Sequence, residues 1–251
     1  MIGDQYVWFV WASMFLLPWL ILFVALPRYR KAMLWASVLT MPFGLTEPLF
    51  VPEYWNPPSL FDLAQRTGFD IESLIFTFAL GGVGAVLYNA LTRKSFVPLG
   101  DRRANHRYHR LSLLTPIVAF PTLYFLPWNP IYPSIAAMLL GAVAALFCRP
   151  DLTRKTFYGG FLFIGFYVVF LQGLELLSPG YIERFWKLSA LSRVMVGTMP
   201  IEELLFAFAL GMYWTGVYEH VTWTAAIRAA PAAERTRTNG DAHHAVATSR
   251  R

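Results

Sequence analysis

Five glutamates lie at the ends of long apolar segments, in positions where a carboxyl group could do chemistry. The set is Glu47, Glu72, Glu175, Glu202 and Glu203. Glu72, Glu202 and Glu203 begin apolar segments, and an acid in the first turn of a helix is favoured by the helix dipole by about 0.3–1 kcal/mol. Helix capping is therefore a sufficient explanation for Glu72 or Glu203 taken alone.

Glu47 and Glu175 come near the ends of their segments, where the helix dipole disfavours a negative charge. A charged residue near the bilayer centre costs about 2.5–3.5 kcal/mol, and less near the interface. The sequence places no Lys or Arg inside the apolar segments, so we expect some of the clustered acids to remain protonated. Neutral carboxylic acids in an apolar pocket suit acid catalysis, and they also suit a proton- or cation-coupled transporter.

The segments that position these acids predict a membrane protein. Of the 251 residues, 56% are hydrophobic and 14% are charged, whereas a soluble domain has about a quarter charged residues. The apolar residues form blocks long enough to span a bilayer as helices. These blocks are 7–26, 32–50, 71–91, 111–128, 131–147, 157–177 and 201–221. We therefore expect an all-α polytopic protein with seven transmembrane helices.

Basic residues set the expected orientation in the cell membrane. Most of the 21 Lys and Arg follow the first, third and fifth segments or lie in the C-terminal tail. The positive-inside rule then places the N-terminus outside and the C-terminus in the cytoplasm. The basic residues thus lie on one side of the membrane, where they contact lipid, and this accounts for the net charge of +6. We therefore expect no nucleic-acid partner. The tail, residues 223–251, lacks periodicity and is expected to be disordered.

Metal and cofactor signals are weak. The single Cys148 excludes an internal disulfide and a cysteine-based metal cluster. His106 and His109 form an H-x-x-H motif, but the flanking arginines repel a cation, so we expect no metal there. No G-x-G-x-x-G motif follows a strand, and we expect no flavin or nicotinamide cofactor.

Two segments 130 residues apart indicate an internal repeat. "IESLIFTFALGGVGAVLYNALT" (71–92) and "IEELLFAFALGMYWTGVYEHVT" (201–222) align without gaps and share matched Glu, Gly, Tyr and Thr residues. Upstream, Glu47 corresponds to Glu175, and each is followed by a loop with an aromatic pair. We expect parallel three-helix repeats at 1–92 and 130–222, with a basic loop and linker helix at 93–129 between them.

The repeated unit resembles a known family. A three-span unit with Pro-x-Glu-Glu followed by Leu-x-Phe, preceded by an acid and an aromatic-containing loop, is similar to the integral-membrane lycopene cyclase domain. "PIEELLF" (200–206) is the closest match. The likeness extends over about residues 5–222, with the specific motifs in the third and seventh segments. It implies a fused, two-repeat cyclase.

The resemblance implies a redox-neutral isomerisation by an intramolecular lyase or isomerase without a cofactor. An acid protonates the terminal double bond of the ψ-end of a linear carotenoid, the neighbouring double bond closes the ring, and a base removes a proton to leave a β-type ring. Glu202, Glu203, Glu72, Glu175 and Glu47 are the candidate acids and bases. Aromatic faces that stabilise a cation are expected from Tyr54, Trp55, Phe185 and Trp186 and from the repeat-related Phe76 and Phe206. Other carotenoid-pathway enzymes would be natural partners.

The first copy departs from the family pattern, because Asp70 and Ser73 stand where the second copy has Pro200 and Glu203. One centre is therefore expected to be degenerate, or the substrate to differ from lycopene. The main rival function is a proton- or cation-coupled transporter, for which parallel repeats and intramembrane acids are suitable. A retinal protein is disfavoured, since all four Lys are expected in loops. We expect Glu202, which has a partner in Glu72, to be the shared functional acid.

Overall fold

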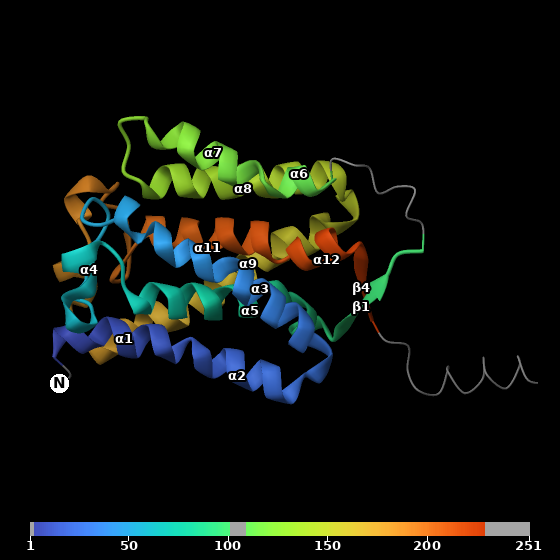
Figure 1. The fold of residues 1–251 in the computed structure, drawn as a ribbon, viewed down its shortest axis with the longest axis horizontal. Coiled ribbons are helices and arrows are strands. Elements are labelled where there is room, and N and C mark those ends of the chain that lie inside the picture. The colour runs from blue at the N-terminus through green and yellow to red at the C-terminus, as the bar shows by residue number, and fades with distance from the viewer. Residues whose placement is uncertain (1–2, 101–108, 229–251) are drawn as a thin grey trace, which may run out of the picture.

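The computed structural model describes residues 3–100 and 109–228. They form a bundle of helices whose axes lie roughly along one direction (Figure 1). The α-helices are α1 (Asp4–Met14), α2 (Leu16–Ala25), α3 (Arg30–Thr40), α4 (Leu63–Thr67), α5 (Ile71–Thr92), α6 (His109–Leu113), α7 (Thr115–Tyr124), α8 (Ile131–Cys148), α9 (Thr153–Leu177), α10 (Tyr181–Phe185), α11 (Ile201–Trp214) and α12 (Val217–Thr222). The 3₁₀ helices and strands are η1 (Pro27–Tyr29), η2 (Met41–Leu49), η3 (Leu60–Asp62), η4 (Pro150–Leu152), η5 (Leu188–Ala190), β1 (Lys94–Pro98), β2 (Met195–Val196), β3 (Met199–Pro200) and β4 (Thr224–Arg228).

Four helices in the described residues are long and apolar enough to cross a membrane. They are Asp4–Ala25, Ile71–Thr92, Ile131–Cys148 and Pro150–Leu177, and Leu111–Tyr124 is a shorter apolar helix. The remaining predicted spans are interrupted. Residues 32–50 form α3 and then the 3₁₀ helix η2, in which Pro42 and Pro48 lack a backbone N–H. Residues 201–221 form α11 and α12, separated at Thr215 and Gly216.

Helix contacts place α11 at the centre of the bundle. It packs against both α8 and α9, while α3 packs against α5. Glycine allows the closest approaches, because a Cβ atom on Gly211 would lie 2.8 Å from the Gly159 carbonyl oxygen and one on Gly81 would overlap Thr40. Small residues at such crossings are characteristic of helix packing inside membranes.

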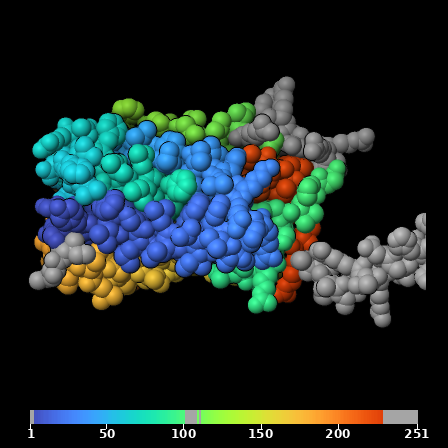
Figure 2. Space-filling view, turned by 60° about the horizontal axis from the view of Figure 1, so that its bottom comes forward, coloured from blue at the N-terminus to red at the C-terminus, as the bar shows by residue number. Residues whose placement is uncertain are grey.

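Apolar side chains cover the outside of the bundle as well as its core. Leu17, Leu20, Ile21 and Val24 of α2 are more than half exposed. The segments α2 and α3, in shades of blue, lie on the face drawn in Figure 2. A water-facing surface would rarely carry an apolar patch of this extent, so the face is suited to lipid.

At one end of the bundle, β1 and β4 pair in antiparallel fashion (Figure 1). The register places Phe96 opposite Ala226, two positions separated by 130 residues. Asn89 and Glu219, separated by the same interval, share a hydrogen bond of 3.0 Å. The expectation of disorder from residue 223 is therefore wrong for Thr224–Arg228, because these residues gain backbone partners in β1. The rest of the predicted tail lies outside the described residues.

At the opposite end, the two aromatic loops meet. Trp55 and Trp186 form an antiparallel bridge, and their rings lie 5.0 Å apart. The Asn56 amide donates to the Phe185 carbonyl at 2.8 Å, and the Lys187 amide donates to Tyr54 at 2.9 Å. These bonds fix both loops over the N-terminal ends of α5 and α11.

Candidate active site

A cavity of about 660 Å³ lies beneath these joined loops. Its walls are mostly aromatic and aliphatic side chains, including Trp8, Trp11, Phe76, Tyr167 and Phe206. The cavity extends from Glu203 to Trp214, two residues of α11 that stand about 16 Å apart along a helix axis. Its volume and apolar lining are typical of a site for a small hydrophobic molecule.

The cavity contains some of the predicted site residues and leaves others out. Lining residues are Glu47, Glu203, Tyr54, Trp55, Trp186, Phe76 and Phe206. Glu72, Glu175, Glu202 and Phe185 are not among them. Phe185 instead packs against Tyr181, with ring centroids 4.6 Å apart. The five glutamates thus have different surroundings, although they lie at similar places along their helices.

Glu203 is held by three donors of three different segments. The Tyr54 hydroxyl donates to Glu203 Oε1, the Trp186 indole N–H donates to the same oxygen at 2.7 Å, and the Tyr167 hydroxyl donates to Oε2 at 3.0 Å. The side chain is 3% exposed. Both carboxyl oxygens accept hydrogen bonds, so the site can satisfy an ionised carboxylate.

Tyr54 remains a donor in this arrangement. Burial raises the pKa of its hydroxyl well above the ordinary value, and the adjacent Glu203 carboxylate raises the pKa further. The hydroxyl therefore stays protonated at physiological pH. Tyr167, in the middle of α9, was not among the predicted site residues because it lies in an apolar run with no sequence signal to distinguish it.

Glu72 and Glu202 bind the loops that precede their helices. The Leu60 amide donates to Glu72 Oε1 at 2.7 Å, and the Ser192 amide donates to Glu202 Oε1 at 2.8 Å. The Tyr132 hydroxyl also donates to Glu202 Oε1 at 2.7 Å. Both acids are fully buried. Glu72 and Glu202 occupy equivalent positions in the two copies, and each accepts a hydrogen bond from the loop before its helix.

Glu175 binds the start of a short helix. Its two carboxyl oxygens each accept a bond of 2.9 Å, one from the Gly180 amide and one from the Ile182 amide. Glu47, its counterpart in the first half, is 8% exposed and lines the cavity. Its Oε1 has no hydrogen-bond partner within the described part of the chain.

The cavity residues with exposed side chains come from η2, from α7 and from the residue that follows α7. They are Phe43, Ile117, Pro121 and Phe125. Nearer the aromatic loops the two elements touch, since the rings of Phe50 and Phe120 lie 6.1 Å apart and the Tyr124 hydroxyl donates to the Leu49 carbonyl at 3.4 Å. The cavity thus reaches the apolar outer surface between η2 and α7, below this contact.

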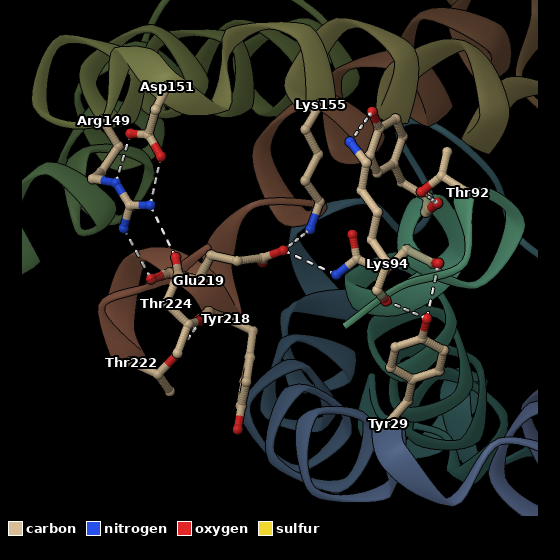
Figure 3. Close-up of polar contacts among 12 residues, drawn as sticks. Tyr29, Thr92, Lys94, Arg149, Asp151, Lys155, Tyr218, Glu219, Thr222 and Thr224 are labelled. Carbon is tan, nitrogen blue, oxygen red and sulfur yellow. Dashed lines mark hydrogen bonds and ion pairs between the residues drawn. The ribbon is translucent and has the colours of Figure 1, made fainter. Parts of the chain in front are cut away.

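A second buried polar cluster lies at the β1–β4 end (Figure 3). Glu219 forms an ion pair with Lys155 and accepts a bond from the Asn89 amide group. Arg149 donates to the Glu219 and Thr224 carbonyl oxygens and pairs with Asp151 at 2.7 Å. Lys155 lies in α9 and not in a loop, which corrects the expectation that every Lys is in a loop.

Lys155 does not line the cavity, so its position gives no support to a retinal site. Its ammonium group neutralises Glu219, which is fully buried. The described residues contain no group of three His, Cys, Asp or Glu able to hold a metal ion. His106 of the H-x-x-H motif lies outside the described residues, and His109 stacks on His220 with ring centroids 5.6 Å apart.

Comparison with known families gives a match to part of the chain. Residues 129–221 match the family model described as lycopene cyclase. This segment is thus similar to the lycopene cyclase family, and the resemblance inferred from the sequence is confirmed over residues 129–221. The matched part contains Tyr167, Trp186 and Glu203, whereas Glu47 and Tyr54 precede it. Neither a search of curated proteins nor a search of solved structures gave a match.

The family indicates an enzyme of the carotenoid cyclase class. Together with the four helices able to cross a bilayer, it identifies a membrane protein.

Proposed function

We propose that this protein is a carotenoid cyclase that converts the ψ-end of a linear carotenoid of the lycopene type into a β-type ring. The observation that carries the proposal is Glu203, a buried carboxylate with three neutral donors at the end of an aromatic cavity, within the segment that matches the lycopene cyclase family. The reaction is a redox-neutral isomerisation initiated by an acid.

The residues around Glu203 suit a carbocation intermediate. The rings of Trp55, Trp186 and Tyr167 line the cavity close to the carboxylate, and aromatic faces attract cations. The carboxylate adds a fixed negative charge in a site of low dielectric constant, where it acts strongly on developing positive charge. The apolar walls exclude water, which would otherwise capture the cation as an alcohol. Glu203 therefore replaces Glu202 as the carboxyl group that we expect to take part in the reaction.

The shape of the cavity suits one end of a polyene. A linear carotenoid is longer than the roughly 16 Å between Glu203 and Trp214, so the rest of the molecule must leave the cavity. The passage between η2 and α7 leads to the lipid-facing surface. The substrate therefore enters sideways from the bilayer, with its reacting end beneath the Trp55–Trp186 pair.

We further infer seven spans and two parallel repeats, with the N-terminus outside and the C-terminus in the cytoplasm. The β1–β4 pairing is centred on two positions 130 residues apart, and so is the Asn89–Glu219 bond. Contacts between equivalent positions are expected on a two-fold axis. Arg149, Lys94 and Lys155 lie at the β1–β4 end, which supports a cytoplasmic location for that end.

The test is expression in cells that accumulate lycopene, followed by chromatography of the pigments. We expect cyclic products with the wild-type chain and unchanged lycopene with Glu203→Gln at equal amounts of inserted protein. Unchanged lycopene with abundant wild-type protein would contradict the cyclase. A transporter would instead show proton-coupled uptake into vesicles that Glu203→Gln abolishes.

A further inference from the structure

We propose that Glu47 is the proton donor that starts the cyclisation and that Glu203 is the carboxylate that receives the proton at its end. This division of roles rests on the proposed function, since it assigns the acid and the base of that reaction. It places the acid in the first half of the chain, outside the segment that matches the family, and the base in the second half.

Close packing of η2 on α5 brings Glu47 to the cavity. A Cβ atom on Gly44 would lie 2.7 Å from the backbone of Ser73, so only glycine allows η2 to approach the first turn of α5 so closely. Glu47 follows three residues later, one turn of a 3₁₀ helix further. Glu47 and Ser73 both line the cavity, next to Trp55.

The surroundings of Glu47 suit a neutral carboxylic acid. The charged side chains that act on it, Asp70 and Glu72, are both acidic, and its neutral hydrogen-bonding neighbours are Ser73 and Trp55. No Lys or Arg is paired with it in the described residues, and its Oε1 has no hydrogen-bond partner. Burial of an ionised carboxylate without a partner is costly, whereas the neutral form carries its own O–H donor.

The two copies of the repeat differ at the position of Glu203. The position in the first copy that corresponds to Glu203 is Ser73, whose buried hydroxyl lies beside Glu47. Beneath the Trp55–Trp186 pair the cavity therefore has Glu203, a carboxylate with three donors, and Glu47, a second carboxyl group whose Oε1 has no hydrogen-bond partner in the described residues. A cyclase needs such a pair, one group that gives a proton and one that accepts it.

The proposed step conserves atoms and electrons. The O–H bond of Glu47 breaks, and its proton forms a C–H bond at the terminal alkene with the alkene π electrons, which leaves a tertiary carbocation. The neighbouring double bond supplies the electrons of the new ring C–C bond, and the positive charge moves into the ring. Glu203 removes a ring proton, and the electrons of that C–H bond form the ring double bond. Proton exchange with water then returns a proton to Glu47 and removes one from Glu203, so that Glu47 is again an acid and Glu203 again a carboxylate.

The experiment compares Glu47→Gln with the matched control Glu175→Gln, its counterpart in the repeat, in lycopene-accumulating cells. Product is measured per amount of inserted protein. General acid catalysis contributes about 10²–10⁴-fold, so Glu47→Gln is expected to lose at least about 100-fold and Glu175→Gln far less. Wild-type output from Glu47→Gln, while the wild-type chain cyclises, would overturn the assignment. Lack of cyclisation by the wild-type chain would instead overturn the proposed function.

A second pair of variants keeps the test valid if Glu47→Gln accumulates poorly. Glu47→Asp and Glu47→Asn have nearly the same shape and differ in the acidic proton. We expect cyclic product from Glu47→Asp and none from Glu47→Asn, and equal output from both would overturn the role of Glu47.

Glu203→Gln is expected to yield traces of products with altered ring double bonds or an added hydroxyl, because the cation then lacks its base. Such products from Glu47→Asn instead would reverse the two roles and overturn the proposal.

Discussion

Glu203 and Glu219 lie on the same stretch of chain, at the start of α11 and within α12, and both are buried. Glu203 has neutral donors and faces a cavity, whereas Glu219 is paired with the Lys155 ammonium group and does not line that cavity. Burial alone therefore does not identify a reactive acid. A cation partner neutralises the carboxylate and makes the pair structural, while neutral donors leave its charge available to a bound molecule.

The largest expected effect is the loss of activity in Glu203→Gln. The amide cannot accept a proton from a ring cation, and its NH₂ group cannot accept the hydrogen bonds made to the carboxyl oxygen that it replaces. We expect cyclic product to fall by at least about 100-fold, with inserted protein retained, as measured by pigment chromatography and immunoblotting. Substantial product from this variant would contradict the view that Glu203, unlike Glu219, takes part in the reaction.

Glu219→Gln is expected to reduce stability and to leave the reaction intact. The change leaves the Lys155 ammonium group, which is 4% exposed, without its carboxylate. Loss of one partner of a buried pair costs about 3–5 kcal/mol of the free energy of unfolding. Thermal unfolding of the purified protein in detergent measures this loss.

Lys155→Met combined with Glu219→Leu is the control for that prediction, because it removes both charges. We expect the double variant to recover part of the lost stability. If product per folded molecule fell in Glu219→Gln as far as in Glu203→Gln, the Lys155–Glu219 pair would belong to the reaction, contrary to our interpretation.

Tyr167→Phe sharpens the comparison by removing one of the three donors to Glu203. A hydrogen bond to a charged group contributes about 1.5–3 kcal/mol, so we expect product to fall by roughly 10–100-fold. Tyr181→Phe is the control, since the Tyr181 hydroxyl is buried without a partner in the described residues and does not line the cavity. Equal behaviour of the two variants in product assays would argue against a functional role for the three donors.

The smallest expected effect is at the passage between η2 and α7. Ile117→Trp adds bulk to a residue that is exposed and lines the cavity, whereas the neighbouring Val118 is exposed and does not line it. We expect Ile117→Trp to slow cyclisation several-fold by hindering entry, and Val118→Trp to have little effect. Rates from time courses with lycopene in proteoliposomes measure the difference. No difference between the two would place the entry route elsewhere.

Much of this architecture follows from local sequence. Apolar blocks predict helices, and the two Glu-led segments predict their common beginnings at Ile71 and Ile201. The interruption of 32–50 by η2 follows from Pro42 and Pro48, although the apolar pattern alone predicted one continuous helix. The pairing of β4 with β1 could not be predicted in this way, because its backbone bonds join residues 130 positions apart.

The sequence by itself determined that acids gather near the ends of apolar helices and that 200–206 resembles a lycopene cyclase motif. Only the tertiary structure decided which acids face the cavity. Glu202 and Glu203 are adjacent, but neighbouring residues point about 100° apart around an α-helix, so one binds a loop and the other reaches the cavity. Tyr167 and Lys155 gain their partners only when α9 packs on α11 and α12. Local sequence patterns do not predict the rotation of α11 about its axis or the contacts of Tyr167 and Lys155, since both depend on how whole helices pack together.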